Sequence, residues 1–348
     1  MKAAQALKPN MVTLTDLAIP KPGPGEIVLQ VKSSLVSCPD IRAARAGNRS
    51  ALGHEVSGIV YDADPAAHFK KGDAIIVPAF SGCGTCPDCQ EGHPEICLNF
   101  ETTGIKGALA EYVLIPAKVA ALCEHKPENV SFSAAAFISP LASVMNGLSM
   151  VPLHDEDRVL IFGSGCMALL YMLVVKHRSK AKVFISAPNQ GTRLKNASKL
   201  GADKVYDINN DFLDTLGRDT LYKYRVKTKE GFEIKEGPHK AELVIDCAGT
   251  VESLNLLVKS ASKGSHILIN AGGPGGMSVD TDAGSIHYDQ MHIHASRGYT
   301  AEDVKAACRL LAEGFDPTPI LTGTLQLDNI AEAFAAHESC PVKYEIVP

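Results

Sequence analysis

The sequence predicts an α/β protein that combines a β-rich domain with a doubly wound parallel sheet domain. Its 348 residues exceed the usual span of one hydrophobic core, so two domains are expected. The first 140 residues hold short β-branched runs punctuated by Gly and Pro, a pattern typical of strands and turns. From about residue 157, short apolar runs alternate with helical patterns, as in a parallel sheet with crossover helices.

The β-rich part is predicted from four short runs, which are 26–34, 56–63, 73–80 and 110–117. A helix with a Thr cap and a Gly stop is predicted over 300–314.

The sheet domain is predicted from a regular order of strands and helices. The expected strands are 158–163, 181–186, 204–208, 241–249 and 265–273. The expected helices are 168–178, 191–203 and 251–262. The polar, alternating segment 220–240 predicts a surface hairpin or long loop inserted in this domain.

Composition excludes several classes of protein. The formal net charge is −5 without a block of like charges, so no nucleic-acid partner is expected. No apolar run reaches the roughly 18 residues that span a bilayer, and the N-terminal stretch lacks a signal-peptide core. We therefore expect a cytoplasmic protein without a membrane partner.

Four of the ten cysteines lie close together at C-x2-C-x2-C-x7-C spacing. They are Cys83, Cys86, Cys89 and Cys97. Two-residue gaps let successive thiolates converge on one tetrahedral cation, and four thiolates close its coordination sphere. The spacing predicts a structural zinc site in a lobe over about 80–100, in preference to four free thiols in a reducing cytosol.

A glycine-rich loop follows the expected strand 158–163 and opens a helix. Gly163, Gly165 and Ala168 occupy the G-x-G-x-x-A positions, with Cys166 and Met167 between the last two. The first glycine permits the tight turn, the second lets the backbone approach a pyrophosphate, and the small third residue lets helix pack on strand. The loop predicts a dinucleotide site rather than a merely structural turn.

The next strand ends at Ser186 and Ala187, where an NAD enzyme usually carries an acidic residue. The missing carboxylate removes repulsion of a 2′-phosphate, and Arg193 just beyond could pair with one. NADP(H) is therefore favoured, with NAD(H) as the alternative cofactor. Arg193 could instead be only a solvated helix residue.

Taken together, these motifs resemble the zinc-type medium-chain dehydrogenase/reductase family, the alcohol, polyol and threonine dehydrogenase group. The resemblance covers nearly the whole chain through "PGPGEIVLQVKSS", "GHEVSG", "FKKGDAIIVP", the cysteine lobe, "GALAEYVLIPA", "FISPLAS", the glycine loop and "EDVKAACRLLAEG". It implies a GroES-like catalytic domain from residues 1–139 and 296–348, and a Rossmann dinucleotide-binding domain over 140–295. It also implies homodimers or homotetramers.

The family resemblance also points to a catalytic site around "GHEVSG". It implies His54 as a ligand of a catalytic zinc, Glu55 as its support, and Asp40 at the family's Asp position. The family's other two ligands are a Cys and a Cys or Glu, but Ser37 and Ser139 occupy those positions here. A neutral hydroxyl is a poor zinc ligand compared with thiolate or carboxylate.

Two alternatives stay open for this site. The loop after Asp40 is short, so Cys38 could turn inward and hold zinc with His54 and with Glu55 or Asp40. Otherwise the cleft is metal-free, and His54 hydrogen-bonds Glu55 or one of the two serines.

Three functions are compatible with these residues. The preferred one is NAD(P)-dependent interconversion of a small-molecule alcohol (a polyol, sugar or related metabolite) and a carbonyl by hydride transfer. Another is zinc-independent NADPH reduction of a carbonyl or conjugated alkene in a biosynthetic pathway, with His54, Ser37 or Cys38 as proton donor. The third is a non-catalytic nucleotide-binding protein. Arg42 stands where the family often has a proton-relay His, and we expect it to contact ribose or phosphate, since Arg is no base near neutral pH.

Overall fold

The computed structural model describes residues 1–47, 51–188, 191–208, 211–228, 231–238, 240–273, 278–336 and 342–348. The chain forms two compact units, one of Met1–Asn146 with Arg297–Pro348 and one of Gly147–Ser296. We call them unit 1 and unit 2. The α/β fold class, a GroES-like β-rich domain plus a Rossmann parallel sheet, is confirmed, whereas the division predicted at 139/140 and 295/296 stays a proposal.

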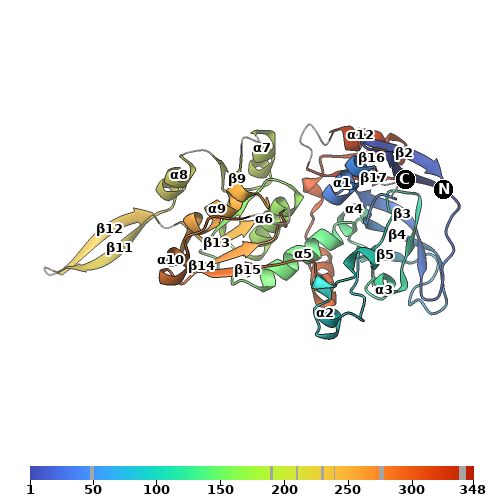
Figure 1. Ribbon diagram of the computed structural model, residues 1–348, viewed down its shortest axis with the longest axis horizontal. Helices are drawn as coiled ribbons and strands as arrows, with labels where there is room; N and C mark the ends of the chain where they lie inside the picture. Colours follow the sequence, from blue (N-terminus) through green and yellow to red (C-terminus); the bar gives the residue numbers. More distant parts are fainter. Residues whose placement is uncertain are drawn as a thin grey trace. The chain divides into compact units, whose positions relative to one another are not determined.

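Unit 1 is built around a seven-stranded sheet with the order β16-β17-β3-β4-β5-β7, in which β6 also pairs with β3 (Figure 1). The pairs are antiparallel except β16 with β17. Its strands are β3 (Ile27–Leu35), β4 (Glu55–Ala63), β5 (Ala74–Val77), β6 (Tyr112–Ile115), β7 (Glu124–His125), β16 (Gly323–Gln326) and β17 (Tyr344–Val347). A separate antiparallel pair is formed by β1 (Lys2–Lys8) and β2 (Met11–Asp16).

Short helices connect the strands of unit 1. They are α1 (Cys38–Ala46), α2 (Pro87–Gln90), α3 (Ala117–Ala120), α4 (Phe132–Ala135), α11 (Ala301–Ala312) and α12 (Ile330–Ala336), with 3-10 turns at Pro94–Ile96, Phe100–Thr102, Thr318–Ile320 and Leu327–Asn329. The helix predicted over 300–314 is confirmed, because Thr300 caps α11 and Gly314 (φ 100°) follows its end. Helix α5 (Ile138–Ser149) crosses from unit 1 into unit 2 along the chain.

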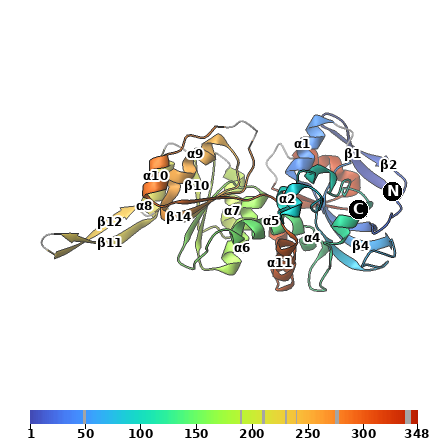
Figure 2. The same ribbon diagram turned by 60° about the horizontal axis from the view of Figure 1, so that its bottom comes forward.

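Unit 2 holds a parallel six-stranded sheet with the order β10-β9-β8-β13-β14-β15. Its strands are β8 (Arg158–Phe162), β9 (Lys182–Ala187), β10 (Lys204–Asp207), β13 (Ala241–Asp246), β14 (Ala261–Ile269) and β15 (His292–Ala295). Its helices are α6 (Cys166–Arg178), α7 (Gly191–Lys199), α8 (Phe212–Asp219), α9 (Val251–Ser260) and α10 (Ala283–Tyr288). Figure 2 shows α9 and α10 on one face of this sheet and α6 on the other, as in a doubly wound fold.

The segment 220–240 forms the predicted hairpin in its described residues. Strands β11 (Leu221–Thr228) and β12 (Gly231–Pro238) pair antiparallel and extend away from the sheet of unit 2 (Figure 1). No helix in the described part of the chain is both long enough and apolar enough to cross a membrane.

Candidate functional site

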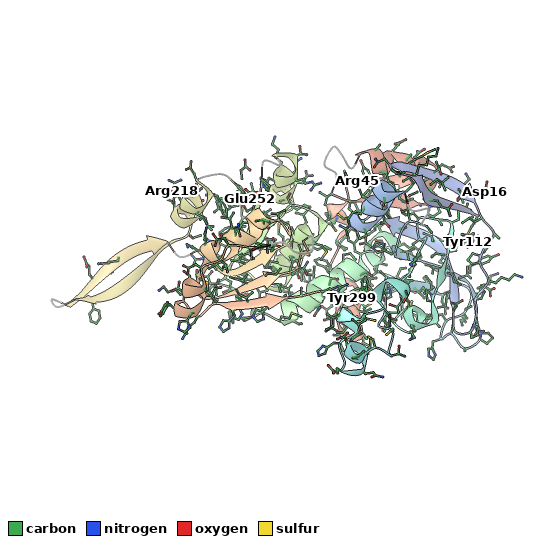
Figure 3. All side chains as sticks on the ribbon, in the orientation of Figure 1. Asp16, Arg45, Tyr112, Arg218, Glu252 and Tyr299 are labelled. Carbon is green, nitrogen blue, oxygen red and sulfur yellow. The ribbon has the colours of Figure 1, made fainter. Side chains whose placement is uncertain are left out.

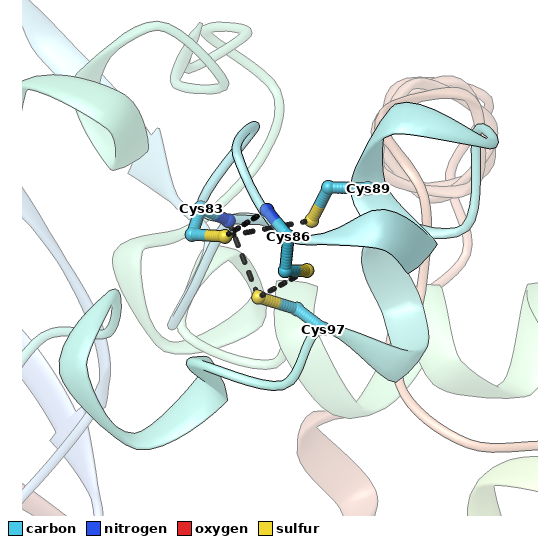
Figure 4. Close-up of side chains that lie close together, drawn as sticks. All are labelled: Cys83, Cys86, Cys89 and Cys97. Carbon is cyan, nitrogen blue, oxygen red and sulfur yellow. Dashed lines mark hydrogen bonds between the residues drawn. The ribbon is translucent and has the colours of Figure 1, made fainter.

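The four clustered cysteines converge on one point in unit 1 (Figure 4). Their Sγ atoms all lie within 4.8 Å of one another, with 4.0 Å between Cys83 and Cys89 and 3.9 Å between Cys86 and Cys97. A tetrahedron with Zn–S bonds of about 2.3 Å has edges of about 3.8 Å, so the thiolates fit one zinc ion. The four side chains form a structural zinc site, as the spacing predicts.

Backbone and side-chain donors favour the thiolate form of Cys83, whereas burial and the neighbouring thiols raise the pKa of Cys89 to about 12. The hydroxyl of Thr85 and the amide of Asn99 donate to Cys83 Sγ, and together with backbone N–H groups they lower the pKa of that thiol to about 5. Such outer donors orient ligands and tune a metal site. The lobe uses all four positions of its zinc, so its role is structural rather than catalytic.

The glycine loop joins β8 to α6 in unit 2. Gly163 has φ 117°, and a Cβ there would lie 3.2 Å from the backbone carbon of Cys247, so the turn requires glycine. Gly165 is the N-cap of α6 without a side-chain cap, and a Cβ there would meet nothing within 4 Å. Ala168 is buried at the helix–strand contact, while Cys166 and Met167 begin the helix. The open N-terminus of α6 fits a pyrophosphate.

The strand beside this loop, β9, ends at two buried residues. The carbonyl of Ser186 accepts a 2.7 Å hydrogen bond from Gly163 N–H, which fixes the loop to the strand. The buried Ser186 hydroxyl has no hydrogen-bond partner among the residues that the structure describes. Ala187 is only 2% exposed and brings no carboxylate to the strand tip. Arg193 is half-buried in the first turn of α7.

In unit 1, His54 lies between two groups that begin helix α1. His54 Nδ1 is 3.5 Å from Asp40 Oδ1, and His54 Nε2 is 3.5 Å from Ser37 Oγ. Ser37 caps α1, and its hydroxyl donates to Asp40 Oδ2 at 2.5 Å. The N–H of Gly53 also donates to Asp40, at 2.8 Å. Sequence-distant residues therefore form a compact Ser–Asp–His cluster.

Burial and charge oppose each other in this cluster. Burial by itself would lower the pKa of His54, but its hydrogen bond and attraction to the Asp40 carboxylate outweigh burial and raise that pKa. Burial would likewise raise the pKa of Asp40, but His54, Ser37 and Gly53 hold it below the usual range. The attraction between the two groups shifts the pair toward the imidazolium–carboxylate form, and the His54 side chain is 28% exposed.

The Glu55 side chain pairs with Lys343, a residue that the sequence patterns did not single out, and its charge contributes to the raised pKa of the neighbouring His54. Lys343 Nζ lies 2.6 Å from Glu55 Oε2, and the two side chains are 4% and 9% exposed. Among the described residues, Glu55 Oε2 accepts no hydrogen bond, so its contact with Lys343 is an ion pair without hydrogen-bond alignment. Lys343 directly precedes the apolar run of β17. A lysine next to a buried strand is the one sequence signal that could have identified it, because lysine side chains are seldom buried without a partner.

Ser139 is likewise engaged elsewhere. Its hydroxyl accepts a 2.7 Å hydrogen bond from Ala79 N–H and lies 3.2 Å from the hydroxyl of Tyr299, which the sequence reasoning also missed and which Figure 3 labels. Tyr299 OH in turn accepts from Phe80 N–H at 3.1 Å. Burial raises the pKa of Tyr299 well above its ordinary value, so the phenol stays neutral and acts as a structural hydrogen-bonding group.

Two other predicted site residues lie on helix α1. Cys38 is the first residue of α1 and is exposed, and Arg42 is exposed one turn further along the same helix. Within the described ranges, the cysteine lobe is the one group of three or more His, Cys, Asp or Glu side chains whose ligand atoms all lie within 4.8 Å. Cys38, His54 and Glu55 form no such group, so a zinc ion held by them stays a prediction without geometric support.

Two family models match successive parts of the chain. The alcohol dehydrogenase GroES-like domain matches residues 23–125, and the zinc-binding dehydrogenase model matches residues 166–313. The chain belongs to the zinc-containing medium-chain dehydrogenase/reductases. It is an NAD(P)-dependent oxidoreductase of the zinc-type alcohol and polyol dehydrogenase family.

Two relatives of this medium-chain dehydrogenase/reductase match it over nearly the whole chain at low identity. The L-threonine 3-dehydrogenase of Pyrococcus furiosus is 26% identical over 349 residues, covering 96% of this chain and 94% of that protein. The enzyme of the same name from Pseudoalteromonas translucida is 25% identical, covering 96% and 95%.

Solved structures share the fold. A Sinorhizobium meliloti protein described as a zinc-binding dehydrogenase, bound to NADP, has a TM-score of 0.82 at 24% identity, covering 100% of this chain and 99% of that chain. An Escherichia coli alcohol dehydrogenase complexed with NADH has a TM-score of 0.83 at 24% identity and the same coverage.

Proposed function

We propose that this enzyme interconverts a small-molecule carbonyl and the corresponding alcohol with NADP(H), using His54 as proton donor and acceptor. The observation that carries the proposal is the His54–Asp40 pair with its Ser37 contact. A general acid works best when its pKa lies near the operating pH. The Asp40 carboxylate raises the pKa of His54 from its ordinary value toward neutral pH.

NADP(H), when bound, would supply the hydride for the carbonyl carbon. His54 then gives its proton to the carbonyl oxygen, so that carbonyl, reduced cofactor and one proton become alcohol and oxidised cofactor. Asp40 holds the imidazole in place and stabilises its charged form, while Ser37 limits the rotation of the ring from the other nitrogen. In the reverse direction the neutral imidazole accepts the proton.

The preference for NADP(H) rests on the tip of β9. Ala187 brings no carboxylate that would repel a 2′-phosphate, and Arg193 begins the next helix with a half-buried cation. NADPH is expected to bind more tightly than NADH, and Arg193→Ala should remove most of that difference. Fluorescence titration of both cofactors measures this, and tighter NADH binding by the wild type would contradict the assignment.

The test of the catalytic role compares His54→Asn with His68→Asn, a control at an exposed histidine of the same unit. NADPH consumption over a carbonyl panel should fall about 10²–10⁴-fold in His54→Asn and stay unchanged in the control. Metal analysis of the same preparations should give the same zinc content in the wild type and in His54→Asn, because the cysteine lobe holds its zinc without His54. Full activity of His54→Asn, or a zinc ion in the wild type that His54→Asn loses, would refute a mechanism in which His54 transfers the proton without a metal.

Assembly stays a prediction: we propose a homodimer or homotetramer, which light scattering on the purified enzyme would measure.

A further inference from the structure

Three histidines gather on neighbouring strands at one edge of the parallel sheet in unit 2. His266 of β14 pairs in register with His292 of β15, and His294 follows two residues later, so its side chain points to the same face. The ring of His266 stacks on that of His292 at 4.6 Å and lies 5.3 Å from that of His294. His266 Nδ1 and His294 Nε2 face each other at 3.2 Å.

That nitrogen separation suits two ligands of one cation. Metal–nitrogen bonds of about 2.0–2.1 Å in a tetrahedral site separate two imidazole nitrogens by about 3.3–3.4 Å. Imidazole is a preferred ligand of Zn²⁺, Ni²⁺ and Cu²⁺. We propose that His266 and His294 chelate a divalent transition-metal cation at this sheet edge, with His292 as the third ligand.

Two groups outside the cluster act on a cation at His266. Asp157 attracts positive charge toward His266, whereas His154 opposes it. His292 is exposed, which leaves the group open to ions from solvent.

Two of the three ligand nitrogens already lie at the separation expected around one cation, and the third requires a movement. The three rings do not form a group whose ligand nitrogens all lie within 4.8 Å of one another. An exposed side chain such as His292 changes rotamer easily, and its turn would complete the ligand set. The hydrogen bond between His266 and His294 would be replaced by two metal–nitrogen bonds, and one ring would change tautomer without net loss of a proton.

The experiment titrates Ni²⁺ into tag-free enzyme that carries its structural zinc, followed by calorimetry. We expect saturable binding by the wild type, weakened about tenfold or more in His266→Asn and in His294→Asn, because each removes one of the two preformed ligands. His292→Asn should weaken binding less, and His287→Asn on α10 is the matched control that should leave it unchanged.

Cu²⁺ electron paramagnetic resonance gives an independent readout on the wild type, which does not depend on how well the variants fold. Nitrogen hyperfine splitting from at least two imidazoles supports the site. Absence of that splitting, or Ni²⁺ binding that persists unchanged in the His266→Asn/His294→Asn double variant, would overturn the proposal.

Discussion

Asp40→Asn tests the electrostatic logic of the His54 cluster without changing the shape of the side chain. The carboxylate accepts hydrogen bonds from Ser37 N–H at 2.9 Å, Ser37 Oγ–H at 2.5 Å and Gly53 N–H at 2.8 Å, and it faces His54. The asparagine amide keeps one acceptor oxygen but turns the other position into a donor. At least one buried donor therefore loses its partner, and the imidazolium loses its counter-charge.

The expected loss of stability follows from these contacts. Hydrogen bonds to charged groups are worth about 1.5–3 kcal/mol each, and breaking a buried ion pair costs about 3–5 kcal/mol. Because Asn keeps part of the network and His54 is partly exposed, we expect about 3 kcal/mol of destabilisation. The pKa of His54 should also fall, since burial then acts without the opposing carboxylate.

The pH dependence has a defined sign. The pKa of His54 is raised on folding, so its contribution is complete below its unfolded pKa of about 6.5 and is lost as pH rises through the folded pKa. The pKa of Asp40 is lowered on folding, so its contribution is present above about pH 4 and lost as pH falls through the folded pKa. The difference between wild type and Asp40→Asn should therefore be largest between about pH 4 and 6.5.

Urea denaturation across this pH range measures the difference, and NMR titration of the imidazole follows His54 directly. Asp62→Asn is the matched control and should cost little, because Asp62 is exposed and accepts a hydrogen bond from the neighbouring Ala63 N–H. An Asp40→Asn protein with wild-type stability and an unshifted His54 titration would show that the carboxylate does not govern the histidine.

Three further outcomes are expected. Cys86→Ser should lose the lobe zinc and have a lower melting temperature. Its control, Cys38→Ser at the exposed start of α1, should keep the lobe zinc when measured by mass spectrometry. A Cys86→Ser protein that still holds this zinc would contradict the four-thiolate site. Gly147→Ala should destabilise unit 2 strongly, because the new Cβ would lie 2.0 Å from the hydroxyl of Tyr171, and wild-type thermal stability would be inconsistent with that packing. Ser139→Ala should cost about 1–2 kcal/mol in denaturant unfolding through its lost hydrogen bonds while leaving zinc content unchanged; a change in zinc content would instead connect Ser139 to a metal.

Features set by short spacing were predictable from the sequence. The four cysteines lie within one lobe, and Gly163 and Gly165 lie within one turn, so local chain geometry already restricts where their atoms can be. The alternation of strands and helices predicted the parallel sheet, because each element carries its own periodicity. The family pattern also singled out His54 and Asp40 as neighbours of one site.

What the sequence by itself left open is how distant segments meet. Cys38 and Ser37 are adjacent in sequence, yet the cap of α1 directs the serine toward His54 and leaves the cysteine exposed. Lys343 neutralises Glu55 only because β17 joins the same sheet as β3 and β4 from the far end of the chain. Such contacts depend on strand pairing and register, which are fixed by the packing of the whole core rather than by the residues on either side.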